Sequence, residues 1–326
     1  MAKTSLVTGG AGFIGSHLTE ELLRMGDRVV VLDDLSTGNT SNLEDVKDHP
    51  FLTIRSGSVL DEALLRELVG SADRVFHLAA AVGVKLIVRD PIKVIRSNVT
   101  GTERILESCA EFGCPVLLAS SSEVYGKSET LPFTEGADMI FGPTERSRWS
   151  YAASKAVGEF LAFAYRKASG LPVVVARFFN TTGKRQSGQY GMVLPRFVLQ
   201  AVADEPITVY GDGEQSRCFA YVGDVVGAAI KLLETPQAYG EVVNLGSEES
   251  TTIRGLAELV KKMAGSASEI VHIPFEEAYE PGFEDMPVRR PDLSKARRLI
   301  GYEPRLSLRE IVAEVIAFTR KEGSDE

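Results

Sequence analysis

The glycine-rich segment TGGAGFIGSHL, residues 8–18, constrains the fold of this chain more than any other feature. It follows a short apolar run, SLVT, and it opens a stretch from 12 to 25 whose apolar residues recur at helical spacing. Gly9, Gly12 and Gly15 stand where a tight turn and a close contact between helix and strand leave little room for a side chain. The sequence therefore predicts that the chain opens with a strand, a turn and a helix.

Short runs rich in β-branched residues alternate with longer stretches of helical periodicity over the first half of the chain. This alternation is typical of a parallel sheet with helices on both faces, because each crossover between parallel strands needs a long connection. We therefore expect an α/β fold, a doubly wound parallel sheet of the Rossmann type. The expected strands are SLVT, VVVLDD, LTIRS, RVFHLAA, PVLLASS, PVVVARF and, later in the chain, EVVNLGS.

The pattern changes after residue 179, where the chain becomes irregular and richer in Gly, Pro and Arg. We expect residues 1–179, with a returning segment at about 224–250, to form the sheet domain. Residues 180–223 and 251–326 should form a smaller, interleaved α+β lobe that binds the substrate.

The 326-residue chain has a net charge of −9 at pH 7 and a pI near 5.2. Nucleic acids and anionic membranes bind clustered Lys and Arg, so this charge argues against both as partners. No apolar run reaches the roughly 18 residues of a membrane span, which predicts a cytoplasmic protein. The three cysteines and four histidines have no metal-ligand spacing, so we expect neither a metal site nor a disulfide framework.

The glycine turn suits a dinucleotide cofactor. Glycine at positions 9, 12 and 15 lets the backbone approach a pyrophosphate, and the unpaired amides of the following helix face its oxygens. The next strand ends in Asp33, whose carboxylate can accept hydrogen bonds from the adenosine ribose and repel a 2′-phosphate. The pattern therefore favours NAD over NADP, with Asp34 as a residue that can instead cap the following turn.

Tyr151 and Lys155 in SYAASK lie one helical turn apart, on one face of a predicted helix, where the ammonium favours the phenolate. Upstream, LLASSSEVYG places Ser121 at the carboxyl end of a predicted strand, the edge where such sheets bind ligands. We expect Ser121 to hold a substrate hydroxyl and Tyr151 to take its proton, with Lys155 supporting Tyr151 and the nicotinamide ribose. In the alternative, Tyr151 is a core residue and the serines merely end a strand.

Together these motifs resemble the extended short-chain dehydrogenase/reductase family, in particular its nucleotide-sugar epimerases, dehydratases and decarboxylases. The resemblance covers nearly the whole chain and adds four motifs: HLAA at 77–80, Asn98 in NVTGT, FFN at 178–180 and VYGDGEQSRCFAYVGD at 209–224. It implies an NAD-dependent enzyme that oxidises a nucleotide-linked sugar, most often a UDP-sugar, at its C4 hydroxyl. It also implies a homodimer that pairs through the helices at 91–112 and 149–169.

The family's binding residues carry over to the matching positions of this chain. For NAD the resemblance implies a set drawn from the turn and the strand ends: Gly9, Gly12, Phe13, Ile14, Gly15, Asp33, Ser58, Val59, Leu78, Ala79, Ala80, Asn98, Tyr151 and Lys155. For the nucleotide sugar it implies Asn180, Val209, Tyr210, Arg217 and Arg289. The two arginines would meet the diphosphate, because a guanidinium donates paired hydrogen bonds to phosphate oxygens; surface ion pairs are the alternative.

Glu123 favours one reaction within the family. The triplet Ser121, Ser122, Glu123 resembles the Thr-Ser-Glu of UDP-glucuronate decarboxylases, and the segments RWSYAASK and EEAYEPGFEDMPVRRPDLSKA are similar to decarboxylases as well. Oxidation at C4 would turn UDP-glucuronate into a β-keto acid that readily loses carbon dioxide. Glu123 with Ser122 would position the ring and assist protonation at C5, and the retained NADH would return hydride to give a pentose.

Three alternatives stay open. Met192 stands where UDP-xylose synthases tend to carry an arginine, which favours a 4-epimerase acting on UDP-glucose or UDP-glucuronate. A 4,6-dehydratase would want an acid beside the glutamate, where Ser122 offers a hydroxyl. A non-catalytic NAD-binding protein could share the fold, although such proteins usually lose Tyr151 or Lys155.

Lys85 and Arg185 are candidate partners for a substrate carboxylate by their position alone. Solvated surface cations are the alternative interpretation of both residues.

Overall fold

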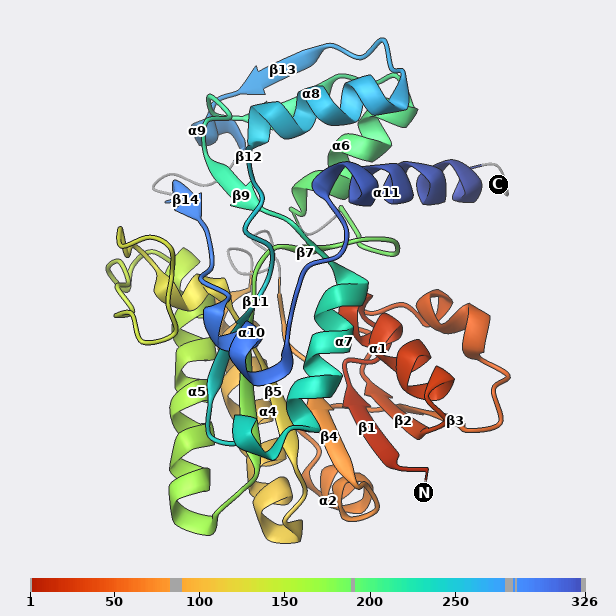
Figure 1. The fold of residues 1–326 in the computed structure, drawn as a ribbon, viewed down its shortest axis with the longest axis vertical. Helices are drawn as coiled ribbons and strands as arrows, with labels where there is room; N and C mark the ends of the chain where they lie inside the picture. Colours follow the sequence, from red (N-terminus) through yellow and green to blue (C-terminus); the bar gives the residue numbers. More distant parts are fainter. Residues whose placement is uncertain (1, 83–89, 189–190, 279–283, 285, 324–326) are drawn as a thin grey trace.

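A seven-stranded parallel sheet is the largest element of the computed structural model, which describes residues 2–82, 90–188, 191–278, 284 and 286–323 (Figure 1). Its strand order is β11-β6-β5-β4-β1-β2-β3, so the winding reverses beside β1. This order confirms the predicted doubly wound α/β fold. The strands are β1 (Thr4–Thr8), β2 (Arg28–Asp33), β3 (Leu52–Ser56), β4 (Arg74–His77), β5 (Val116–Ser121), β6 (Val173–Phe178) and β11 (Val242–Leu245).

Helices cover both faces of the sheet, and each face has its own buried apolar cluster. Successive strand residues point to opposite faces, so Leu6 packs in one cluster and Val7 in the other. The helices of one face are α2 (Glu62–Gly70), α4 (Pro91–Phe112) and α5 (Arg148–Ser169). The helices of the other are α1 (Phe13–Arg24), α7 (Val222–Leu233) and α10 (Ser294–Ile300). Although α10 falls within 251–326, it packs against α7 and β11 of the sheet domain.

A second lobe stands beyond the carboxyl ends of the strands, at the top of Figure 1. Its core is an apolar cluster shared by α6 (Val193–Val202), α8 (Ile253–Ala264) and α11 (Leu308–Glu322). Two small sheets flank it, one of β8 (Ile207–Tyr210) and β13 (Ile270–Ile273), the other of β9 (Ser216–Cys218), β12 (Ser250–Thr252) and β14 (Val288–Arg289). The shorter elements are η1 (Thr40–Val46), η2 (Ser122–Tyr125), β7 (Thr181–Thr182), β10 (Ala220–Tyr221), η3 (Pro236–Ala238) and α9 (Phe275–Ala278).

A buried ion pair fixes α5 against the sheet. The guanidinium of Arg177 on β6 donates to both oxygens of Glu159, at 3.0 and 2.7 Å, and the hydroxyl of Ser120 donates to the same carboxylate at 2.5 Å. All three side chains are buried, where an ion pair is stable only if its hydrogen bonds are satisfied. Because Glu159 lies one helical turn after Lys155, this pair holds that part of α5 at the edge of β5.

Among the described residues, no helix is long and apolar enough to cross a bilayer. The same part of the chain brings together no group of three His, Cys, Asp or Glu side chains that could hold a metal ion. The cytoplasmic location and the domain boundaries stay predictions.

Candidate active site

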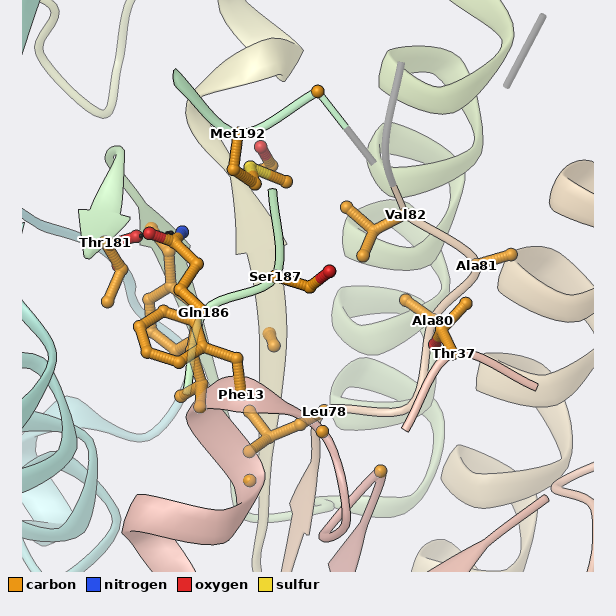
Figure 2. A pocket seen from close by; sticks show the side chains of 18 of the residues that line it. Phe13, Thr37, Leu78, Ala80, Ala81, Val82, Thr181, Gln186, Ser187 and Met192 are labelled. Carbon is orange, nitrogen blue, oxygen red and sulfur yellow. Dashed lines mark hydrogen bonds between the residues drawn. The ribbon is translucent and has the colours of Figure 1, made fainter. Parts of the chain in front are cut away.

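A cavity of about 700 Å³ runs along the carboxyl ends of the sheet strands and continues under the second lobe. Figure 2 shows Ala80, Ala81 and Val82 on one wall, across from Ser187 and Met192. Doubly wound sheets bind their ligands at this edge, and a cleft of this volume accommodates a dinucleotide together with part of a second ligand.

The glycine turn has no side chains on its inner surface. A ligand can therefore lie close to the backbone of the turn. Gly9 has a left-handed φ of 73°, and a Cβ on it would lie 2.8 Å from the backbone nitrogen of Ala79. A Cβ on Gly15 would lie 2.0 Å from the carbonyl oxygen of Gly9. Gly12 then caps α1, and Phe13 and Ile14 of its first turn line the cavity. The turn and the helix end therefore fit the pyrophosphate of a dinucleotide.

Asp33 lies at the adenosine end of the cavity. Its carboxylate accepts the backbone N–H groups of Ala11 at 2.9 Å and Leu35 at 2.8 Å, which leaves its orientation fixed. Burial raises the pKa of Asp33, and these two hydrogen bonds oppose the rise. Asp34 is exposed and accepts the backbone N–H of Ser36. It therefore caps the turn after β2, which was the alternative role given to it from the sequence.

The cavity wall at the end of β4 is supported by Asn98, which the sequence analysis predicted to contact the cofactor directly. Leu78, Ala79 and Ala80 line the cavity, as do Ser58 and Val59 on the adenosine side. Asn98 is absent from this lining. Its side chain instead accepts the N–H of Ala81 at 2.9 Å, and donates to Ser154 Oγ at 3.2 Å. Asn98 therefore ties the wall to α5, and its direct contact with the cofactor stays a prediction.

Tyr151 and Lys155 project from α5 into the cavity beside the end of β5. Burial and then the charge of Glu123 raise the pKa of Tyr151, and a hydrogen bond with Ser121 opposes the rise. Lys155 Nζ donates to the carbonyl oxygen of Ala119 at 3.0 Å. Burial lowers the pKa of Lys155 to about 8, and the charge of Glu159 opposes this fall. The phenol, the ammonium and the Ser121 hydroxyl are therefore brought together as the sequence predicted for proton transfer.

Glu123 lies in η2, directly after the strand that carries Ser121 and beside Ser122, which also lines the cavity. Its carboxylate is buried between Arg148, at 2.6 Å, and Arg289. Burial alone would raise the pKa of Glu123, but the two guanidinium groups outweigh it and lower the pKa to about 2. Glu123 is therefore ionised at neutral pH and accepts hydrogen bonds.

Most residues predicted to meet the nucleotide sugar line the second half of the cavity: Asn180, Tyr210, Arg217 and Arg289. Val209 does not. It is fully buried in the core of the second lobe, because neighbouring residues of β8 point to opposite faces. The Val209 side chain therefore points away from the cavity, and a contact between this residue and the substrate stays a prediction.

Arg185 is not placed to meet a substrate carboxylate. Its guanidinium donates to both oxygens of Glu20 on α1, at 2.5 and 2.8 Å, and to the carbonyl oxygen of Asn42 at 2.6 Å. These hydrogen bonds pair the Arg185 guanidinium with a carboxylate of the protein itself. This corrects the prediction that Arg185 meets a carboxylate of the substrate. Lys85, the other candidate, lies outside the described residues.

Two lining arginines were missed by the sequence analysis. Arg148 precedes Tyr151 by three residues in RWSYAASK, and that spacing, which places both on one helix face, could have identified it. Arg196 on α6 lies 3.9 Å above the ring centre of Tyr210 and donates to the carbonyl oxygen of Thr208. No motif marks Arg196, because its partners are on β8. With Arg217 and Arg289, these arginines make the second half of the cavity cationic in a chain of net charge −9.

The comparisons with known proteins agree on one family. The family model described as GDP-mannose 4,6 dehydratase matches residues 6–315. The UDP-N-acetyl-alpha-D-glucosaminuronate decarboxylase of Bacillus cytotoxicus is 41% identical over 100% of both chains. The UDP-glucuronic acid decarboxylase 1 of Danio rerio is 36% identical over 98% of this chain and 73% of its own. The structure of UDP-glucuronic acid 4-epimerase from Bacillus cereus with UDP-glucuronic acid and NAD has a TM-score of 0.88 at 29% identity, and the match covers 98% of this chain and 99% of that chain.

We predict that Gly15→Ala weakens NAD binding roughly tenfold or more, because the new Cβ would force the turn away from the pyrophosphate. Titration of the purified protein with NAD, followed by protein fluorescence, measures the effect. Gly227→Ala in α7 is the matched control, since a Cβ there meets no described atom within 4 Å. Equal NAD affinity in Gly15→Ala and the wild type would contradict the assignment of the turn.

Proposed function

The chain belongs to the GDP-mannose 4,6-dehydratase family, and from that premise we propose that it is an NAD-dependent decarboxylase of a UDP-linked uronic acid. Two relatives named as decarboxylases of such sugars support the reaction, and the epimerase complex supports UDP-glucuronate and NAD as ligands. The observation that carries the proposal is the buried carboxylate of Glu123 between Arg148 and Arg289, beside Tyr151.

The first step is oxidation at C4 of the sugar. When bound along the glycine turn, NAD would supply the acceptor for the C4 hydride and the source from which C4 regains it. Ser121 holds the C4 hydroxyl, and Tyr151 takes its proton as the C–H bond breaks. Burial raises the pKa of Tyr151, so this transfer needs positive charge nearby, which the ammonium of Lys155 supplies.

The second step breaks the bond between C5 and the carboxylate. Carbon dioxide leaves, and the electron pair passes into an enolate whose oxygen accepts hydrogen bonds from Ser121 and the protonated Tyr151. Glu123 is ionised, so it orients the ring by accepting hydrogen bonds from sugar hydroxyls. The proton that C5 gains comes from solvent through a water molecule beside Glu123 and its arginines, and bulk solvent replaces the proton that this water gives up. Reduction at C4, with a proton from Tyr151, then gives the pentose.

A 4-epimerase is the second candidate. Met192 and Val82 face one another across the cavity (Figure 2). Because both side chains are apolar, a 4-keto ring could turn over between them without breaking polar contacts. The same pocket would then return hydride to the other face of C4. A 4,6-dehydratase is less favoured, because Ser122 offers a hydroxyl where an acid is needed.

To test the proposal, the purified enzyme is incubated with NAD and with UDP-glucuronate, UDP-N-acetylglucosaminuronate or UDP-glucose. The masses of the products are then measured by mass spectrometry. We expect at least one uronic acid to lose carbon dioxide and UDP-glucose to stay unchanged. In Glu123→Gln, kcat should fall by about 100-fold or more, as when a charge-stabilising group is lost, with unchanged NAD affinity.

Glu248→Gln is the matched control, because Glu248 pairs with Arg297 at the surface and lies outside the cavity lining. It should keep wild-type activity. An isomer of unchanged mass from UDP-glucuronate would replace the decarboxylase with the 4-epimerase. Decarboxylation at the wild-type rate by Glu123→Gln would reject the role of that residue.

We further propose that two copies pair through α4 and α5, which lie side by side on one face of the sheet domain. Both helices expose large apolar side chains: Ile92, Ile95, Val157 and Phe160, of which Ile92 and Phe160 are 78% and 70% exposed. Exposed apolar area of this kind is typical of an interface between subunits. Light scattering should give the mass of a dimer, and a monomer that persists at high protein concentration would contradict the pairing.

A further inference from the structure

Residues 183–188, which we call the strap, leave β7 and border the cofactor half of the cavity. The ion pair between Arg185 of the strap and Glu20 of α1 is not used by the reaction described above. We propose that this pair latches the strap over the bound dinucleotide and retains its reduced form until C4 is reduced again. The proposal rests on the proposed function, because only a cycle that returns its hydride needs such retention.

The latch consists of hydrogen bonds from the Arg185 guanidinium to two residues, Glu20 and Asn42. Arg185 donates to both oxygens of Glu20, at 2.5 and 2.8 Å, in the paired geometry that makes guanidinium–carboxylate contacts strong. It also donates to the carbonyl oxygen of Asn42, at 2.6 Å. The Arg185 side chain is 13% exposed and that of Glu20 29%, so solvent screens the pair only in part. Arg185 adopts a left-handed φ of 63°, which a non-glycine residue keeps only where its contacts hold it.

The partners of Arg185 belong to the elements that form the pyrophosphate site. Glu20 lies on α1, whose first turn carries Phe13, and a Cβ on Gly183 of the strap would lie 3.8 Å from the Phe13 ring. Asn42 in η1 donates through its side chain to the carbonyl oxygen of Ala11, within the glycine turn. Arg185 therefore joins the strap to both flanks of the turn where the pyrophosphate fits.

Hydrogen bonds of Gln186 hold the strap against β7. Gln186 donates to the carbonyl oxygen of Thr181 at 2.9 Å and accepts the hydroxyl of Thr182 at 2.8 Å. Gln186 and Ser187 line the cavity, and Figure 2 shows Ser187 on the side of the strap that faces Ala80. A dinucleotide lying on the glycine turn would thus have the strap on its outer side, and its release would require the strap to move.

Retention decides which product leaves the enzyme. If the reduced dinucleotide stays, its hydride returns to C4, and the products are carbon dioxide and a UDP-pentose. If it leaves after decarboxylation, the products are carbon dioxide, NADH and a UDP-4-ketopentose. In that case the C4 hydroxyl proton balances the proton gained at C5, and the enzyme must take a new NAD from solution.

The experiment compares Arg185→Met and Glu20→Gln with the wild type. The rate of NADH release is measured by stopped-flow fluorescence, and the ratio of UDP-4-ketopentose to UDP-pentose by mass spectrometry. We expect NADH release to quicken roughly tenfold in both variants, as for the loss of a charge-assisted pair. The 4-keto product and free NADH should accumulate in proportion. Glu20→Gln preserves the shape of a surface helix residue, so it tests the latch even if Arg185→Met folds poorly.

Arg24→Met is the matched control, because Arg24 pairs with Glu21 at the exposed surface of α1, at 2.6 Å, and neither residue belongs to the strap or lines the cavity. It should release NADH and partition its products as the wild type does. The latch is overturned if NADH release and product ratio are unchanged in Arg185→Met and Glu20→Gln, or if Arg24→Met changes them equally. If no protein releases carbon dioxide, the proposed function fails, and the NADH release rates still decide the latch.

Discussion

The carboxylate of Glu123, buried between the guanidinium groups of Arg148 and Arg289, is the contact on which the rest of the site depends. It joins three elements that are distant in sequence: η2 after β5, the first turn of α5, and β14 of the second lobe. A buried carboxylate is tolerated because both guanidinium groups compensate its charge, and loss of either would leave an uncompensated charge. The same contact therefore orients the second lobe over the sheet and fixes the charge beside the reacting sugar.

The position of α5 follows from two such contacts. Arg148 at its beginning pairs with Glu123, and Glu159 further along pairs with Arg177 of β6. Tyr151 and Lys155 lie between these two anchors, which is why a phenol and an ammonium can be held rigidly at the end of β5. Their burial shifts both pKa values away from the ordinary range. The fold thus supplies the preorganisation that the proposed chemistry needs.

The fold and family could be predicted from local patterns, and the comparisons confirm the family. Each strand of the sheet is a β-branched run, and the glycine turn and the Tyr151 and Lys155 pair depend on spacings of a few residues. The contacts that were missed or assigned wrongly depend on long-range packing. Arg185 meets Glu20 across 165 residues, and Asn98, predicted to contact NAD, bonds to the backbone of Ala81. No local spacing encodes such contacts.

The most direct test of the account is the mass of the product formed from UDP-glucuronate in D₂O. The account predicts a UDP-pentose that carries one non-exchangeable deuteron, because the carbon dioxide lost from C5 is replaced by a proton from solvent. A UDP-hexuronate without deuterium would contradict it, since the carboxylate would then have survived and the ring would only have been epimerised at C4.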